Sequence, residues 1–299
     1  MTPSLPEFCG FVALVGRPNV GKSTLLNILL GQKISITSRK PQTTRHRIIG
    51  IDTQDQYQAI FVDTPGIHQV QTNAMNRYMN RAATSTIADV DVAVFIVDQL
   101  KWDKKDELVV QDLMAARSPV ILVLNKIDRL TNKSRLLPHM HSLASVFDWA
   151  EVLPVSAKTG YQLDRLREAI YQRLPEQSHL YDRDQITDRS ERFMAAELIR
   201  EKLMRQFGDE LPYQVAVEIE SFDYKDHVIH INGLIWVERD GQKKIIIGRA
   251  GEKIKKIGTD ARKDIEAMIE KKVMLKLWVK VKSSWSDDER MLKSLGFDE

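Results

Sequence analysis

Short apolar runs alternate with longer helical stretches through the first half of the chain. The runs lie at residues 11–15, 58–62, 92–97, 120–124 and 152–155. Because strands that are apolar on both faces and separated by helices belong to covered parallel sheets, the pattern predicts a doubly wound α/β domain with a mostly parallel sheet. Such domains bind ligands at the carboxyl ends of their strands, so the residues after each run are candidates for a site.

The pattern changes at residues 175–190, a polar stretch without periodicity. A helix is predicted to begin near Asp188, with Thr187 or Asp188 as its N-cap. Two strands with alternating apolar positions follow between residues 215 and 237, then lysine-rich helical stretches, and the alternation returns at residues 273–281. The second half therefore has the order α-β-β-α-α-β, which predicts a smaller α+β domain.

These patterns predict four segments along the chain. We place the first domain at residues 8–176, a linker at 177–190, the second domain at 191–285 and an acidic C-terminal tail at 286–299. A chain of 299 residues is long enough for two domains that each have a hydrophobic core.

The composition is that of an ordinary soluble protein, with 43% hydrophobic and 28% charged residues. No apolar run approaches the length of about 20 residues that spans a bilayer. The first residues lack a basic stretch and their apolar run is short, so we expect no secretory signal. Cys9 is the single cysteine, which excludes an internal disulfide framework and agrees with a reducing cytosol.

The distribution of charge along the chain is more informative about binding partners than the net charge of +3. Residues 239–282 carry 14 basic and 6 acidic side chains, whereas acidic residues are in excess in the stretches before and after them. A basic block of this kind is what a binding surface for a polyanion would contain, although many lysine-rich stretches are only solvated faces.

A glycine-framed octapeptide after the first apolar run fits the pattern G-x-x-x-x-G-K-[ST]. Its residues are Gly16, Arg17, Pro18, Asn19, Val20, Gly21, Lys22 and Ser23. The glycines let backbone N–H groups turn toward a phosphate, and the start of the following helix adds partial positive charge. Lys22 can reach the outer phosphates and Ser23 can ligate Mg²⁺, so the octapeptide predicts a nucleotide-binding loop.

Asp63, Thr64, Pro65 and Gly66 follow the run at 58–62. An aspartate at this position can hold the Mg²⁺ shell through a water molecule. A glycine at position 66 lets its N–H approach a γ-phosphate.

Two further motifs follow the runs at 120–124 and 152–155, and both point to guanine. The first is Asn125, Lys126, Ile127 and Asp128, and the second is Ser156, Ala157 and Lys158. A carboxylate at Asp128 can accept hydrogen bonds from N1–H and the 2-amino group of guanine together, a pair that adenine does not offer. The N–H of Ala157 can meet guanine O6, so the expected nucleotide is GTP or GDP.

The order of these motifs resembles that of the translation-factor-related GTPases. The resemblance extends to the segment Pro41-Gln42-Thr43-Thr44-Arg45, whose family counterpart contains a threonine that ligates Mg²⁺ and closes on the γ-phosphate. That threonine aligns best with Thr44, and Thr43 stays an alternative. The resemblance implies GTP hydrolysis with Lys22, Thr44 and Gly66 as the catalytic groups.

One position departs from the pattern of Ras-like enzymes. Where those enzymes have a glutamine that orients the attacking water, this chain has Ile67, which cannot orient water by hydrogen bonding. Hydrolysis should therefore be slow or use catalytic electrostatics from elsewhere. Asn19 resembles a P-loop asparagine that helps bind K⁺ in related GTPases, and a simple turn-forming role is the equal alternative.

The basic block contains a second glycine motif, Gly248-Arg249-Ala250-Gly251, between two predicted helices. A turn of this kind can clamp a nucleic-acid backbone without obstruction by side chains. Arg249, Lys253, Lys255 and Lys256 would supply charge for the phosphates. The α-β-β-α-α-β order resembles the type II KH domain, which implies an RNA-binding groove of aliphatic side chains.

A P-loop GTPase domain followed by this KH domain resembles the Era family of bacterial GTPases over nearly the whole chain. The resemblance implies binding of 16S ribosomal RNA near its 3′ end and a role in maturation of the small ribosomal subunit. It also implies a cytoplasmic protein with peripheral association with the inner membrane. We expect a monomer.

Two other classes stay open at this point. A tRNA-modifying GTPase of the MnmE kind shares the threonine-rich segment and the P-loop asparagine, but that family carries a cysteine in a C-terminal motif and here the sole cysteine is Cys9. A signalling GTPase whose second domain binds protein or membrane is the other alternative. A double-GTPase ribosome factor is excluded, because only one G-K-[ST] sequence exists.

Overall fold

The computed structural model describes residues 6–40, 42–65, 74–79, 81, 89–115, 117–208 and 211–297. Their contacts divide the chain into two compact units. The second unit contains the residues from Arg189 onward together with two short pieces of the first half of the chain, 36–43 and 74–78, and the first unit contains the rest. No described helix has the length and apolarity needed to cross a bilayer.

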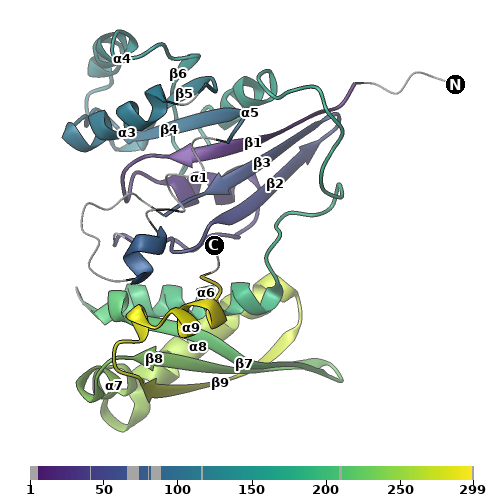
Figure 1. Cartoon of the computed structure of the whole chain (residues 1–299), viewed down its shortest axis with the longest axis vertical. Coiled ribbons are helices and arrows are strands. Elements are labelled where there is room, and N and C mark those ends of the chain that lie inside the picture. Colours follow the sequence, from purple (N-terminus) through teal and green to yellow (C-terminus); the bar gives the residue numbers. More distant parts are fainter. Residues whose placement is uncertain are drawn as a thin grey trace, which may run out of the picture. The chain divides into compact units, whose positions relative to one another are not determined.

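The first unit is built on a six-stranded sheet with the order β2-β3-β1-β4-β5-β6 (Figure 1). The strands are β1 (Phe8–Val15), β2 (Ile48–Gln54), β3 (Tyr57–Asp63), β4 (Val92–Asp98), β5 (Val120–Asn125) and β6 (Glu151–Pro154). All neighbours pair in parallel except β2, which runs antiparallel to β3. Every residue of β5 is buried, as expected for a strand with helices on both faces.

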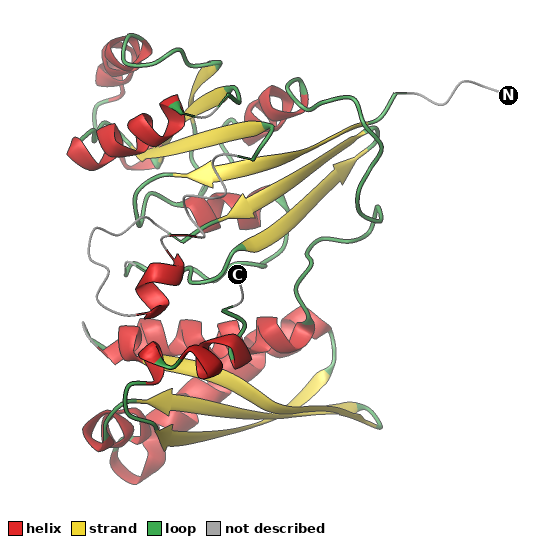
Figure 2. Ribbon diagram, in the orientation of Figure 1, coloured by secondary structure: helices red, strands yellow, loops and turns green. Residues whose placement is uncertain are grey.

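Four described helices belong to the same unit as this sheet, and Figure 2 shows helices in red beside its yellow strands. They are α1 (Lys22–Leu29), α3 (Lys104–Met114), α4 (Leu136–Ala144) and α5 (Leu163–Tyr171). Apolar side chains of α3 and α4 share one core cluster with β1, β4 and β5, while α1 and α5 contact β3. The predicted doubly wound fold with a mostly parallel sheet is confirmed.

The sequence pattern did not predict β2. Its apolar residues end at Ile51, and the hairpin turn to β3 at Asp55 and Gln56 interrupts a long polar stretch. Register with β3 is maintained from Ile48 opposite Asp63 to Gln54 opposite Tyr57. The pairing partner, rather than the apolar content of β2, defines this strand.

The predicted N-cap of the first helix in the second unit is wrong. Helix α6 (Glu191–Gln206) begins three residues later than Asp188, and its cap is Ser190, whose side chain accepts a hydrogen bond from the N–H of Phe193. Thr187 does not cap the helix, because its hydroxyl donates to the carbonyl of Ile49 in β2 at 2.7 Å. The end of the linker thus pairs with the edge of the first sheet instead of starting a helix.

The second unit has the predicted order α-β-β-α-α-β. After α6 come β7 (Val215–Lys225), β8 (Val228–Val237), α7 (Asp240–Ile247), α8 (Glu252–Ile269) and β9 (Lys272–Val281). The sheet order is β7-β8-β9, with β8 antiparallel to β7 and parallel to β9. Two helices and the sheet contribute to the core of this unit: Leu198, Ile199 and Leu203 of α6, Ile231 and Ile235 of β8, and Ile257, Ala261 and Ile265 of α8.

The described residues after β9 pack into a hydrophobic cluster. Trp285 is fully buried, and helix α9 (Glu289–Ser294) buries Leu292 in the same cluster. Met75 from the first half of the chain joins this cluster. Of the described acidic residues after β9, Asp288 caps α9 by accepting from the N–H of Met291, and Glu289 lies in the first turn of the helix.

Leu292→Ala should therefore lower the free energy of unfolding by about 2–4 kcal/mol, because removing buried methyl groups leaves a cavity. The exposed neighbour Lys293 offers a matched control, and Lys293→Ala should change stability by less than about 0.5 kcal/mol. Urea denaturation of the full chain measures both. Equal small effects would contradict the packing of α9.

Candidate functional site

The P-loop wraps around the carboxyl end of β1 and leads directly into α1. Gly16 has a positive φ of 141°, and a Cβ atom there would lie 2.3 Å from the carbonyl oxygen of Ile96. Glycine is therefore required by both backbone conformation and space. Arg17 fastens the loop to the N-terminus of α3, where it pairs with Asp103 and with the buried carboxylate of Asp106 at 2.7 Å.

Lys22 points back into the loop. Its Nζ donates to the carbonyl oxygens of Gly16 at 2.8 Å and Arg17 at 3.1 Å. Burial lowers the pKa of Lys22 to about 8, and the charge of Asp63 opposes that shift. The ammonium group is thus held inside the cradle whose backbone would receive a phosphate.

Three hydroxyl groups meet at one oxygen of Asp63, the last residue of β3. Oδ2 accepts from Ser23 at 2.7 Å, from Ser35 at 2.8 Å and from Thr44 at 3.4 Å. The hydroxyls of Ser23 and Thr44 are themselves 3.0 Å apart. The hydroxyl of Thr43 donates instead to the carbonyl of Lys40, so of the two threonines only Thr44 reaches the cluster.

The other oxygen of Asp63 is buried and has no hydrogen-bond partner among the described residues. Burial raises the pKa of this carboxyl group, whereas Lys22 and the three hydroxyls act in the opposite direction. An unsatisfied buried carboxylate oxygen beside two hydroxyls is a donor set suited to a hard cation, and these residues fit Mg²⁺. Ser35 was not among the predicted site residues, because a serine in a loop carries no distinctive pattern.

Asn125 joins three segments at the ends of neighbouring strands. Its side-chain amide donates to the carbonyl of Val20 in the P-loop at 2.9 Å. Its Oδ1 accepts from the N–H of Ala157 at 3.0 Å and of Lys126 at 2.8 Å. The residues predicted for phosphate and for guanine are therefore connected by one buried side chain.

Lys126 and Asp128 complete the predicted guanine pocket. Nζ of Lys126 is 2.9 Å from the carboxylate of Asp98 and also donates to the carbonyl of Asn19. The carboxylate of Asp128 is exposed and accepts from the hydroxyl of Ser156 at 2.7 Å, which orients it. Asp98 was not predicted, since it is the polar end of a strand like many others.

The remaining predicted nucleotide residues lie around these groups. Thr64 and Pro65 are buried just beyond β3, Ile127 opens a short 3-10 turn, and Lys158 is exposed. Pro18 belongs to the turn of the P-loop. Gly66, Ile67 and Pro41 lie outside the described residues.

The second glycine motif forms a tight turn between α7 and α8. Gly248, Ala250 and Gly251 all have positive φ, at 73°, 50° and 79°. A Cβ atom at Gly248 would lie 2.7 Å from the side chain of Lys253, whereas one at Gly251 would meet nothing within 4 Å. Gly251 is the N-cap of α8, so the first N–H groups of that helix lie beside open space.

The basic side chains around this turn differ in their exposure. Arg249, Lys255 and Lys256 are exposed, while Lys253 is half-buried and places Nζ 5.7 Å from the ring centre of Phe207. Exposed cations beside helix N–H groups favour binding of an anion at this turn.

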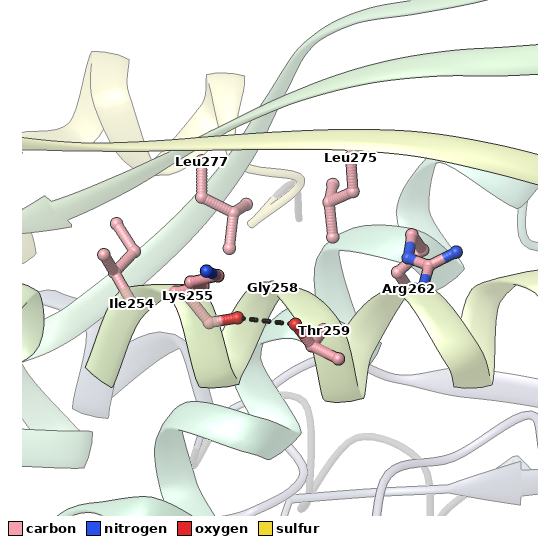
Figure 3. A pocket seen from close by; sticks show the side chains of 7 residues that line it. All are labelled: Ile254, Lys255, Gly258, Thr259, Arg262, Leu275 and Leu277. Carbon is pink, nitrogen blue, oxygen red and sulfur yellow. Dashed lines mark hydrogen bonds between the residues drawn. The ribbon is translucent and has the colours of Figure 1, made fainter. Parts of the chain in front are cut away.

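A cavity of about 260 Å³ lies beside the turn, between α8 and β9 (Figure 3). Leu275 and Leu277 of β9 point toward α8, from which Ile254 and Gly258 provide the apolar opposite wall. Polar and basic groups of α8 complete the lining: Lys255, Thr259 and Arg262. Leu275 and Leu277 alternate in register with the buried Val273 and Val279, and both are only half-buried because this cavity interrupts the core.

Comparisons with known proteins cover the whole chain. A family model described as 50S ribosome-binding GTPase matches residues 11–126, and one described as KH domain matches residues 210–286. A protein of Ectopseudomonas mendocina named GTPase Era is 60% identical over 99% of both chains, and one of Marinobacter nauticus with the same name is 58% identical over 99% of this chain and 98% of its own. The chain belongs to the GTPase Era family.

Solved structures of Era agree with this assignment. A variant of Aquifex aeolicus Era bound to GDP·AlF4⁻ has a TM-score of 0.94 at 38% identity, covering 98% of this chain and all of that one. The same values hold for Era in complex with MgGDPNP and nucleotides 1506–1542 of 16S ribosomal RNA. The predicted family, the two-domain fold and the assignment as a GTPase are confirmed. Full-length similarity to Era also decides against the tRNA-modifying and signalling alternatives.

Asp128→Asn should weaken GTP binding by about 2–4 kcal/mol and improve binding of xanthosine triphosphate, because an amide donor suits the 2-oxo group. The hydroxyl of Ser156 can still donate to the asparagine oxygen, so the loop should keep its shape. Nucleotide competition measures the selectivity. Asp164→Asn, which removes an exposed carboxylate on α5, is the control, and an unchanged preference for guanine in Asp128→Asn would refute the assignment.

Proposed function

We propose that the chain is a GTP-hydrolysing switch that binds the 3′ region of 16S ribosomal RNA through its KH domain and assists maturation of the small ribosomal subunit. The observation that carries the proposal is that one chain contains two candidate sites. One is a P-loop beside Asp63, whose buried oxygen without a hydrogen-bond partner among the described residues suits a cation, and the other is the glycine turn at 248–251 beside an apolar cavity. The solved Era complex with MgGDPNP and 16S ribosomal RNA nucleotides supports both parts.

In this proposal the P-loop N–H groups and Lys22 bind the β- and γ-phosphates. Ser23 and Thr44 hold Mg²⁺ directly, and Asp63 holds it through water. Bound Mg²⁺ would neutralise charge that develops on the phosphate oxygens. The contacts of Ser23 and Thr44 with Asp63 support these roles, because they bring the oxygen atoms of the three side chains together. The N–H of Gly66 is assigned to the γ-phosphate.

Ile67 leaves the orientation of the attacking water to other groups, and we assign part of that role to K⁺ near Asn19. Asn19 has a positive φ of 66°, a conformation that asparagine tolerates well, and its carbonyl accepts from Lys126. The backbone conformation also supports the simpler view that Asn19 only forms the turn. A substitution that keeps the conformation and removes the side chain separates the two roles.

Asn19→Gly should abolish any stimulation of GTP hydrolysis by K⁺ relative to Na⁺, because glycine retains the left-handed backbone and provides no side-chain oxygen. Single-turnover rates in KCl and NaCl at matched ionic strength test this for the wild type and the variant. Equal rates of the wild type in both salts would remove K⁺ from the mechanism.

The turn at residues 248–251 and the cavity beside it are assigned to single-stranded RNA. Phosphates would meet the N–H groups at the start of α8 together with Arg249, Lys255 and Lys256, and Lys253 contributes charge from a half-buried position. Bases would enter the cavity against Ile254, Leu275 and Leu277. A cytoplasmic location, peripheral association with the inner membrane and a monomeric state stay predictions.

Gly251→Asp should weaken binding of single-stranded RNA about tenfold or more, because it places a carboxylate against the phosphate backbone. Asparagine has a similar shape and the same tolerance of positive φ, so Gly251→Asn is the matched control and should retain more affinity. Fluorescence anisotropy with a 16S 3′-end oligonucleotide gives the affinities, and thermal unfolding confirms that both variants fold. RNA affinity that is unchanged in Gly251→Asp would refute the RNA site.

A further inference from the structure

The segment Ile36–Thr43 lies between two residues of the candidate metal site. Ser35 before it and Thr44 after it both direct their hydroxyls at Asp63. The segment itself belongs to the second compact unit, which also contains α6, whereas Ser35 and Thr44 belong to the first. Whatever holds the segment can therefore influence Thr44 directly through the chain.

Two residues of α6 hold the start of the segment. The N–H of Thr37 donates to the carboxylate of Glu201 at 2.9 Å, and Glu201 is fully buried. Arg205 donates to the carbonyl of Thr37 at 3.1 Å and to its hydroxyl at 3.0 Å, and it also pairs with Glu201 at 3.0 Å. Both backbone groups of Thr37 are thus bound by side chains of one helix.

A third residue of α6 holds the end of the segment. Arg200 donates to the carbonyl of Thr43, the residue immediately before Thr44. Arg200 is itself fixed by Glu197 at 2.6 Å, and both side chains are buried. Lys40, in the middle of the segment, donates to the carbonyls of Phe207 and Gly208 at the end of α6.

The burial of Arg200, Glu197 and Glu201 indicates that these charges have a specific role in addition to any effect on stability. A buried ion pair costs desolvation energy, and apolar residues of similar size often stabilise a fold as well or better. Here the charged groups are directed at backbone atoms of a single short segment, so they specify its position rather than fill space.

We infer that Arg200, Glu201 and Arg205 are positioning residues for GTP hydrolysis, because they hold residues 36–43 so that the hydroxyl of Thr44 stays beside Ser23 and Asp63. The inference rests on the proposed role of Thr44 toward Mg²⁺. It adds that α6, from the RNA-binding half of the chain, provides the side chains that keep this threonine in place. Loosening them should weaken the GTP-bound state more than the GDP-bound state, because only the γ-phosphate requires Thr44.

The test compares Arg205→Ala with Arg192→Ala in the full chain. Both remove an exposed arginine from α6, but Arg192 contacts only carbonyls of β7 among the described residues, those of Ile219 and Glu220. Lys40→Ala weakens the same attachment from the side of the segment, so the test does not depend on one variant. Arg205→Lys retains a donor for the Thr37 carbonyl and should restore part of the effect.

The first measurement is hydrogen exchange of the nucleotide-free protein over residues 36–44. We expect faster exchange in Arg205→Ala and Lys40→Ala than in Arg192→Ala. The second is hydrolysis and binding with Mg²⁺: kcat and affinity for GDPNP should each fall about threefold to tenfold, with GDP affinity unchanged. Exchange equal to that of the control would overturn the inference.

The inference is equally overturned if exchange rises while kcat and the GDPNP to GDP affinity ratio stay at control values, because the segment would then be held for packing alone. Thr44→Ala serves to separate this result from a failure of the proposed function. If Thr44→Ala hydrolyses GTP normally, the assignment of Thr44 itself is wrong, whatever the exchange of residues 36–44 shows.

Discussion

Asp63 ends β3 with no exposed surface, and one of its oxygens has no hydrogen-bond partner among the described residues. Burying a carboxylate in this way costs solvation energy, which three hydroxyls and the nearby charge of Lys22 offset only in part. The remaining oxygen is suited to the shell of a divalent cation. The candidate nucleotide site depends on this constraint, because the hydroxyls that meet at Asp63 come from α1 and from the two residues that flank the segment 36–43.

The proposed RNA-binding role sets a different requirement for the second unit, because backbone N–H groups must reach an anion without side chains in the way. Positive φ at Gly248, Ala250 and Gly251 makes the turn tight enough for α8 to begin at its edge. The half-buried leucines of β9 leave a cavity where a tightly packed core would have none. Charge for phosphates and an apolar surface for bases therefore lie next to each other on one helix.

Helix α6 packs in the core of the second unit and also binds the backbone of residues 36–43. One side contributes Leu198, Ile199 and Leu203 to the core of the second unit. Its charged residues Arg200 and Glu201 are about as buried as those apolar side chains, because they bind the backbone of residues 36–43. From the sequence these charges resemble the solvated face of an amphipathic helix. The spacing of charges along a helix is the same whether the face meets water or another segment.

The sequence by itself determined the local chemistry of this protein. The P-loop, the Asp128 motif and the turn at 248–251 could be predicted because each works through contiguous residues whose backbone conformation is set by glycine and by the adjoining strand or helix. The apolar run of β5 likewise indicated burial directly, because every residue of that strand is buried. The alternation in β9 indicated which face points inward, but not that Leu275 and Leu277 are only half-buried beside a cavity. Only the tertiary structure decided which distant residues complete these sites. Strand β2 is defined by its pairing with β3, and Thr187 caps no helix because its hydroxyl donates to the carbonyl of Ile49 in β2. Ser35 and Asp98 belong to the candidate nucleotide site through their contacts with Asp63 and Lys126, which common residue types do not reveal. Thr44 was separated from Thr43 for the same reason, because the direction of a hydroxyl depends on how the chain around it is held.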